Sequence, residues 1–104
     1  MEFEEFQSWS RTTAVYPKDE AIEYTYMGLV SEVGELGGIF KRIIRDETYP
    51  DRETLIKEIG DVLWYLTRLT DECSVSLEEV AEANRVKLED RRSRNVIKGE
   101  GDER

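Results

Sequence analysis

The sequence predicts an all-α protein that forms a single domain of 104 residues with four helices. Two long segments, about 19–45 and 52–71, carry apolar side chains three or four positions apart, the spacing of one helix face. Residues that cap helices, Asp19, Asp51 and Ser76, stand where three helices should begin. Apolar residues also lie on more than one side of several helices. We therefore expect a four-helix-bundle-like core that is completed by oligomerisation.

The first helix is expected within residues 2–13, where Phe3, Phe6 and Trp9 recur every third position. An aromatic stripe of this kind is more typical of a core or an interface than of a surface that stacks on bases. Pro17 restricts the preceding residue to extended geometry, so a connection should separate this helix from the next one.

The fourth helix should begin at Ser76, because Glu79 stands three residues later and completes a capping box. Its pattern stops at Ser93. The polar, glycine-containing residues 93–104 that follow are expected to be either a disordered tail or a loop that folds over a ligand or a neighbouring subunit.

Two pairs of acids interrupt the apolar faces of the two long helices: Glu32 with Glu35, and Glu58 with Asp61. Residues three positions apart on a helix have Cβ atoms about 5–6 Å apart, so each pair points one way. If the helices pack antiparallel, four carboxylates converge. Carboxylates without histidine or thiolate suit a hard cation, Mg²⁺ first and Mn²⁺ second, and the chain contains no histidine.

The alternative interpretation is that these acids are solvated or only form ion pairs. A single Glu-x-x-Glu on a helix is usually surface, but two pairs inside apolar stripes are less expected by chance. Gly34, Gly37 and Gly38 lie around the first pair and Gly60 lies inside the second. Small residues there would let a partner helix or a ligand approach the backbone closely.

The net charge of −9 argues against binding to nucleic-acid polymers or anionic membranes. Residues 85–98 are the exception, with six bases and two acids. On the fourth helix Asn84, Lys87 and Arg91 fall on one side, which suits a phosphate chain bridged by metal. A solvated helix end would show the same cations.

Cys73 is the only cysteine, so no internal disulfide can form and a reducing cytoplasm fits. The acidic N-terminal residues do not resemble a secretory signal. No apolar stretch approaches the roughly 20 residues that span a bilayer.

The two acid motifs, Glu32-Val-Gly-Glu35 and Glu58-Ile-Gly-Asp61, are separated by 22 residues. They resemble the ExxE…ExxD signature of the all-α nucleoside triphosphate pyrophosphohydrolases, and the chain looks like the MazG-like subgroup. Residues 84–91 resemble the Asn-x-x-Lys-x-x-x-Arg element of that family's last helix, and residues 98–104 resemble the ending of some small members. Ser31 departs from the pattern, since many members carry a third acid there.

The resemblance implies magnesium-dependent hydrolysis of a nucleoside triphosphate, often a deoxynucleotide, to the monophosphate and pyrophosphate. It assigns the metal ions to four carboxylates, those of Glu32, Glu35, Glu58 and Asp61. Glu32 is the expected catalytic residue, which would orient or deprotonate the attacking water. Phosphate contacts are expected from Lys41, Asn84, Lys87 and Arg91.

Three functions remain open at this point. The first is a nucleotide pyrophosphohydrolase for sanitation or balance of the nucleotide pool, acting as a homodimer or homotetramer. The second is phosphoribosyl-ATP pyrophosphohydrolase, which would share the metal motif. The third is a non-catalytic helical module for oligomerisation or regulation.

Overall fold

The computed structural model describes all 104 residues and contains four α-helices and no strand, which confirms the all-α prediction. The helices are α1 (Phe3–Ser10), α2 (Ala21–Asp46), α3 (Arg52–Glu72) and α4 (Leu77–Ser93), with 3₁₀ turns at Arg11–Thr13 and Lys18–Glu20. The predicted start of the second helix at Asp19 was early, because that residue lies in a 3₁₀ turn that leads into α2.

The other two predicted helix starts are confirmed in atomic detail. The Asp51 carboxylate accepts a hydrogen bond of 2.7 Å from the amide of Thr54 at the start of α3. At the start of α4, the hydroxyl of Ser76 accepts from the amide of Glu79 at 3.0 Å, and the Glu79 carboxylate accepts from the amide of Ser76 at 3.3 Å. These bonds satisfy amides that have no partner within the helix.

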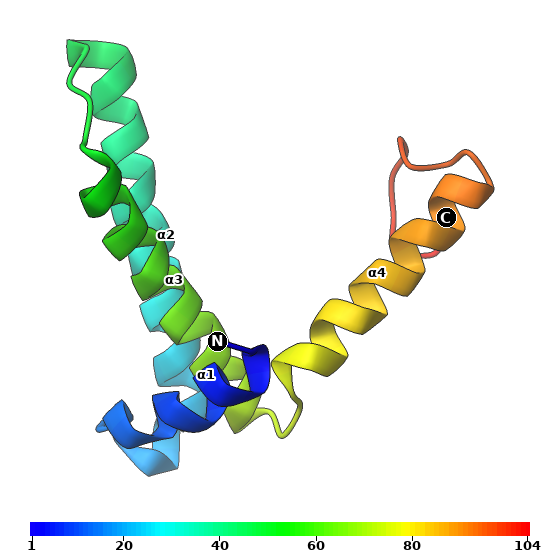
Figure 1. Cartoon of the computed structure of the whole chain (residues 1–104), viewed down its shortest axis with the longest axis horizontal. Coiled ribbons are helices and arrows are strands. Elements are labelled where there is room, and N and C mark those ends of the chain that lie inside the picture. The colour runs from blue at the N-terminus through cyan, green and yellow to red at the C-terminus, as the bar shows by residue number, and fades with distance from the viewer.

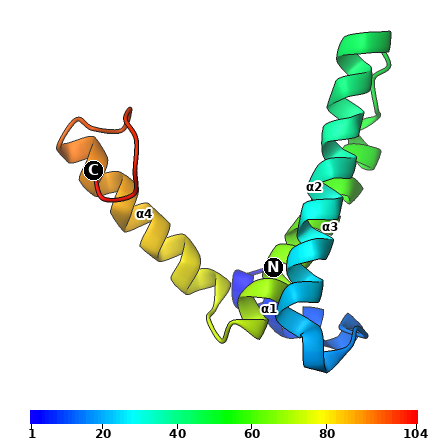
Figure 2. The same cartoon turned by 180° about the vertical axis from the view of Figure 1, so that it is seen from behind.

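The long helices α2 and α3 pack side by side as an antiparallel hairpin, whereas α4 leaves in another direction (Figures 1 and 2). The short α1 lies where the two arms meet and contacts both α3 and α4. The chain is therefore V-shaped, and α4 does not lie along the hairpin. Four helices are present as predicted, but a single chain does not close them into a four-helix bundle.

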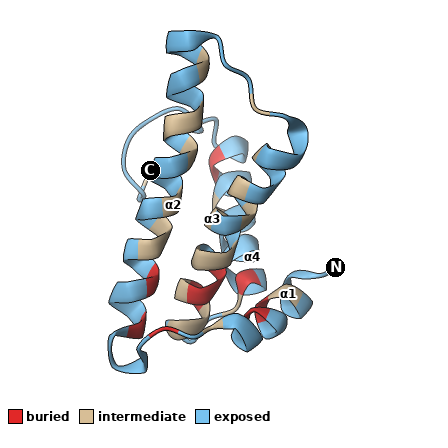
Figure 3. Ribbon diagram, turned by 90° about the vertical axis from the view of Figure 1, so that its left-hand side faces the viewer, coloured by how far each residue is buried: buried red, intermediate tan, exposed pale blue.

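Burial is concentrated where the arms meet (Figure 3). The buried apolar residues are Tyr16, Ala21 and Leu77, and all of the other buried residues are polar or charged. Large apolar side chains remain exposed along both arms, including Val30, Val33 and Phe40 on α2, Ile56, Ile59, Leu63 and Leu66 on α3, and Val80, Val86 and Leu88 on α4. The aromatic stripe of α1 is also half open, since Phe3 and Trp9 are about half exposed.

Arg68 organises the junction of the two arms. Its side chain is 3% exposed and forms ion pairs with Asp71 at 3.0 Å and Glu72 at 3.1 Å. It also donates hydrogen bonds to the hydroxyls of Tyr16 and Ser10, each at 3.1 Å. A buried guanidinium is tolerated here because carboxylates and hydroxyls satisfy its donors.

Gln7 connects α1 to the beginning of α4. Its amide nitrogen donates to the Asp71 carboxylate and to the carbonyl of Val75, each at 3.0 Å. Its amide oxygen accepts from the backbone amide of Leu77 at 2.8 Å. Because Leu77 is the first residue of α4, this bond helps to fix where the second arm starts.

Candidate metal centre

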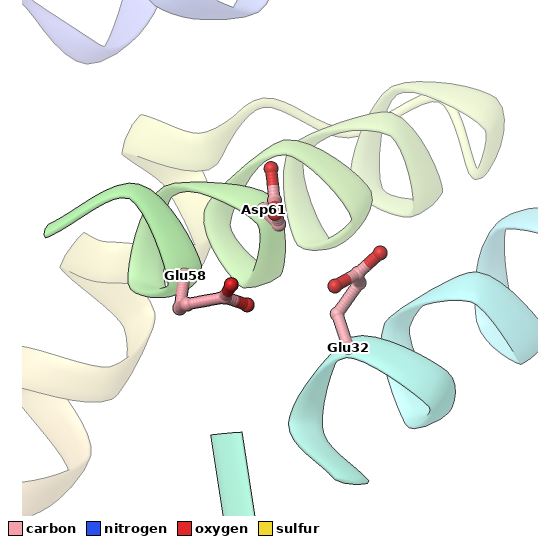
Figure 4. Close-up of side chains that lie close together, drawn as sticks. All are labelled: Glu32, Glu58 and Asp61. Carbon is pink, nitrogen blue, oxygen red and sulfur yellow. The ribbon is translucent and has the colours of Figure 1, made fainter. Parts of the chain in front are cut away.

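The α2–α3 hairpin brings together three of the four predicted metal ligands. Glu32 comes from α2, and Glu58 and Asp61 come from α3 (Figure 4). One carboxylate oxygen from each of the three residues lies within 4.8 Å of the others. Glu32 and Glu58 are half-buried, and Asp61 is exposed. No lysine, arginine or histidine pairs with any of the three at salt-bridge distance.

The chemistry of these donors fits a hard divalent cation. Magnesium binds oxygen at about 2.1 Å, so opposite ligands of one ion are about 4 Å apart. The three oxygens therefore need only small side-chain adjustments to share one ion. Oε2 of Glu32 is buried and has no hydrogen-bond partner, and an unsatisfied buried acceptor is costly unless something binds it.

The pKa of Glu32 is raised above its ordinary value, mainly because burial disfavours the charged form. The neighbouring carboxylates add to the effect, first Glu35 and then Asp61 and Glu58. A cation placed among these groups would favour the charged form of Glu32 and so oppose both causes. A carboxylate with a raised pKa is also a better proton acceptor than an ordinary glutamate.

Glu35 does not belong to the group of three. It is exposed and lines an open hollow beside the cluster, together with Gly34, Gly38, Arg42 and Glu58. Its carboxylate still raises the pKa of Glu32. The structure therefore places the predicted fourth ligand at the rim of the centre, where it faces the hollow.

The sequence interpretation chose Lys41 as a phosphate contact, but the structure places its neighbour Arg42 in the hollow. Arg42 lies seven residues after Glu35 and four after Gly38, so helical periodicity puts all three on one face. Lys41 lies about 100° away around α2. That spacing was the signal that could have identified Arg42.

One glycine allows the two helices to approach closely near the carboxylates. A Cβ atom built on Gly28 would lie 2.1 Å from Cε1 of Tyr65, so any larger residue would displace the ring. Gly28 is one turn before Glu32, and Tyr65 is one turn after Asp61. At the glycines around the acids the result differs: Gly34, Gly37 and Gly60 face open space. Within one chain no helix uses them for close approach.

Residues 20–96 match the model of the MazG nucleotide pyrophosphohydrolase domain. The chain belongs to this family. It is similar to the "Gene 37 protein" of Mycobacterium phage L5, with 38% identity over 109 residues, covering 95% of this chain and 96% of that protein. No solved structure matches the chain.

In this MazG domain the predicted phosphate contacts of the last helix lie on the second arm. Asn84 is exposed on α4, and Lys87 and Arg91 follow on the same helix. Because α4 diverges from the hairpin, a single chain does not bring these three residues to the carboxylates. They remain predicted contacts.

The C-terminal residues fold back along α4 (Figure 1). The carboxylate of Asp102 lies 2.8 Å from Nζ of Lys87 and 3.1 Å from the guanidinium of Arg91. Residues 94–104, expected to be a disordered tail or a loop over a ligand or a neighbouring subunit, fold back onto α4 of their own chain. None of the helices combines the length and the apolarity of a membrane span.

Proposed function

We propose that this MazG domain hydrolyses nucleoside triphosphates, deoxynucleotides included, to the monophosphate and pyrophosphate with Mg²⁺, for which Mn²⁺ can substitute. Its role would be sanitation or balance of the nucleotide pool. Family membership supports this function. The observation that carries it is the group of Glu32, Glu58 and Asp61, within which a buried oxygen of Glu32 lacks any hydrogen-bond partner.

In this proposal Glu32, Glu58 and Asp61 hold the metal, and Glu35 completes the coordination from the rim. The bound ion supplies charge neutralisation for the triphosphate and lowers the pKa of a coordinated water. Glu32 would orient that water toward the α-phosphorus and accept its proton. Arg42 faces the hollow beside Glu35 and Glu58, and it would contact the phosphates there.

We also propose that the active species is a homodimer or a homotetramer. Large apolar side chains are exposed along both arms, and contact with the matching surfaces of a second copy would bury them. Assembly would also supply Asn84, Lys87 and Arg91 to a metal centre that lacks them within its own chain. The single cysteine, Cys73, is exposed and unpaired, which agrees with a reducing cytoplasm.

The test is incubation of the purified protein with dNTPs, NTPs and phosphoribosyl-ATP plus Mg²⁺, with products separated by ion-exchange chromatography. Monophosphate plus pyrophosphate is the expected result, and it establishes attack at the α-phosphorus. Turnover of phosphoribosyl-ATP and of no other nucleotide would favour a phosphoribosyl-ATP pyrophosphohydrolase. Diphosphate plus orthophosphate would contradict the proposed position of attack. No turnover with either Mg²⁺ or Mn²⁺ would favour the non-catalytic helical module.

A further inference from the structure

The C-terminal residues 94–104 form a second hairpin, which contains no helix and is distinct from the α2–α3 hairpin. Its last residue, Arg104, holds it closed. The guanidinium of Arg104 donates to the backbone carbonyls of Val96 at 3.2 Å and Ile97 at 3.1 Å. It also donates to the carbonyl of Gly101. Gly101 has a φ of 82°, in the left-handed region that favours glycine. This arrangement returns the chain to α4 and presents the next residue, Asp102, to the helix.

Asp102 contacts α4 in two chemically different ways. Its carboxylate pairs with Lys87 and Arg91, whereas its backbone carbonyl accepts a further hydrogen bond of 2.8 Å from Arg91. The Arg91 side chain is only 6% exposed, but that of Asp102 is 75% exposed. The carboxylate therefore lies on the outside of the contact, open to exchange with another anion. The hydrogen bond from Arg91 to the Asp102 carbonyl does not depend on the charge of the Asp102 side chain.

We propose that Asp102 is an internal competitor for the phosphate-binding cations. Its carboxylate occupies Lys87 and Arg91 until a phosphate group of the substrate displaces it. This inference rests on the proposed function for the role of the two cations. A carboxylate and a phosphate accept the same charge-assisted hydrogen bonds from lysine and arginine, but a phosphate group carries more charge and more acceptor oxygens.

The strength of the contact suits reversible exchange. The Asp102 side chain is 75% exposed, and an ion pair with so exposed a carboxylate contributes little, so a multiply charged anion can replace it. The hairpin keeps Asp102 tethered next to the cations, which gives it a high effective concentration. The carbonyl bond to Arg91 and the bonds of Arg104 can persist while the carboxylate turns away. The substrate would then gain the cations without unfolding the hairpin.

The experiment measures binding of inorganic pyrophosphate to the 104-residue chain by calorimetry, at low salt and with EDTA present. Asp102→Asn keeps the backbone carbonyl and removes the competing charge, so it should bind pyrophosphate about three- to tenfold more tightly. Glu103→Gln is the matched control, because it removes the same charge from the neighbouring exposed residue. It should change affinity less than twofold. Lys87→Gln should weaken binding.

A second variant tests the same idea without changing charge. A side chain at Gly101 meets open space but a strained φ, so Gly101→Val should loosen the hairpin and also tighten pyrophosphate binding. This variant decides the question if Asp102→Asn does not fold. Equal or weaker binding by a folded Asp102→Asn would overturn the proposal, since Asp102 would then only orient the cations. Unchanged binding by Lys87→Gln would also overturn it.

Failure of this inference can be distinguished from failure of the proposed function. The binding measurement contains no divalent metal and no reaction, so it depends neither on Glu32, Glu58 and Asp61 nor on turnover. A protein that hydrolyses nucleotides but shows no effect of Asp102→Asn refutes the competitor alone. A protein without turnover whose Asp102→Asn variant binds pyrophosphate more tightly refutes the pyrophosphohydrolase function alone.

Discussion

Helix α3 carries two clusters of acids that differ in what surrounds them. Near its beginning, Glu58 and Asp61 lie beside Glu32 with no cation in the group, and the pKa of Glu32 is raised. Near its end, Asp71 and Glu72 are paired with Arg68, and the pKa of Asp71 is held well below its usual range. Desolvation acts on both clusters, but only the second contains its own compensating charge.

This difference separates the proposed metal site from a cluster that stabilises the fold. The cluster at the end of α3 is satisfied, and its bonds to α1 stabilise the junction of the two arms. The cluster near the start of α3 has like charges and an unsatisfied oxygen without a compensating side chain, which supports the proposed metal site. Substitutions should therefore have opposite effects on stability and activity in the two clusters.

The largest effect is expected from Asp61→Asn, which removes a metal ligand. Hydrolysis should fall by about 10²–10³-fold or more, and stabilisation by Mg²⁺ in thermal unfolding should be lost. The metal-free protein should keep its melting temperature. Glu53→Gln is the control on the same helix, because that carboxylate is exposed and pairs only with Lys57. Magnesium stabilisation that survives in Asp61→Asn would contradict the metal centre.

Arg68→Ala should act on stability. Removing the guanidinium leaves the partly buried Glu72 without its cationic partner and leaves Asp71 with Arg11 alone, which should lower the free energy of unfolding by about 3 kcal/mol. Urea denaturation measures this value. Arg85→Ala is the control, since its pair with Glu82 is well exposed and should contribute less than about 1 kcal/mol. Similar losses in both variants would show that the junction does not depend on Arg68.

Asp71 gives the same joint a pH dependence. Its hydrogen bond from Arg11 is the main cause of its lowered pKa, with Gln7 and Arg68 contributing. The folded state thus binds this proton more weakly than the unfolded chain, so the stabilisation is complete above about pH 4–5 and is lost at lower pH. Asp71→Asn should cost about 2 kcal/mol at pH 7. The difference in melting temperature from wild type should shrink below pH 4, and a constant difference down to pH 3 would contradict this assignment.

A comparison of Arg42→Ala with Lys41→Ala tests the hollow beside the carboxylates. Arg42 lines it and Lys41 does not, so only the first substitution should raise the KM for nucleotide, by about tenfold for one charge-assisted phosphate contact. Steady-state kinetics at saturating Mg²⁺ measure both variants. A larger effect of Lys41→Ala would support the sequence-based assignment of Lys41 instead.

The sequence predicted those features that depend on local spacing. The acid pairs at i and i+3, and the caps at Asp51 and Ser76, follow from one-dimensional patterns. The sequence could not predict that Arg68 is buried, because its partners Ser10 and Tyr16 are more than 50 residues away. The direction of α4 could not be predicted from the sequence either, because it depends on the hydrogen bond that the Gln7 side chain accepts from the amide of Leu77.

Lys41 stays a predicted phosphate contact, although Arg42 and not Lys41 lines the hollow beside the carboxylates. A shift of one residue on a helix rotates a side chain by about 100°, which is enough to move it out of a site. The contact of Asp102 with Lys87 and Arg91 required a different kind of information. It exists because Gly101 adopts a left-handed conformation and Arg104 closes the hairpin, and neither event appears in a periodic pattern.

The smallest expected effect is on the stability of the metal-free protein after Glu32→Gln. Glutamine keeps the shape of the side chain but removes a charge that burial and three neighbouring carboxylates disfavour. The free energy of unfolding at pH 7 should therefore rise by about 0.5–1 kcal/mol in EDTA, although activity is lost. Asp71→Asn, the matching change in the paired cluster, should lower it. If both substitutions destabilise the metal-free protein, the first cluster is held together by contacts of its own, and the contrast between the two ends of α3 fails.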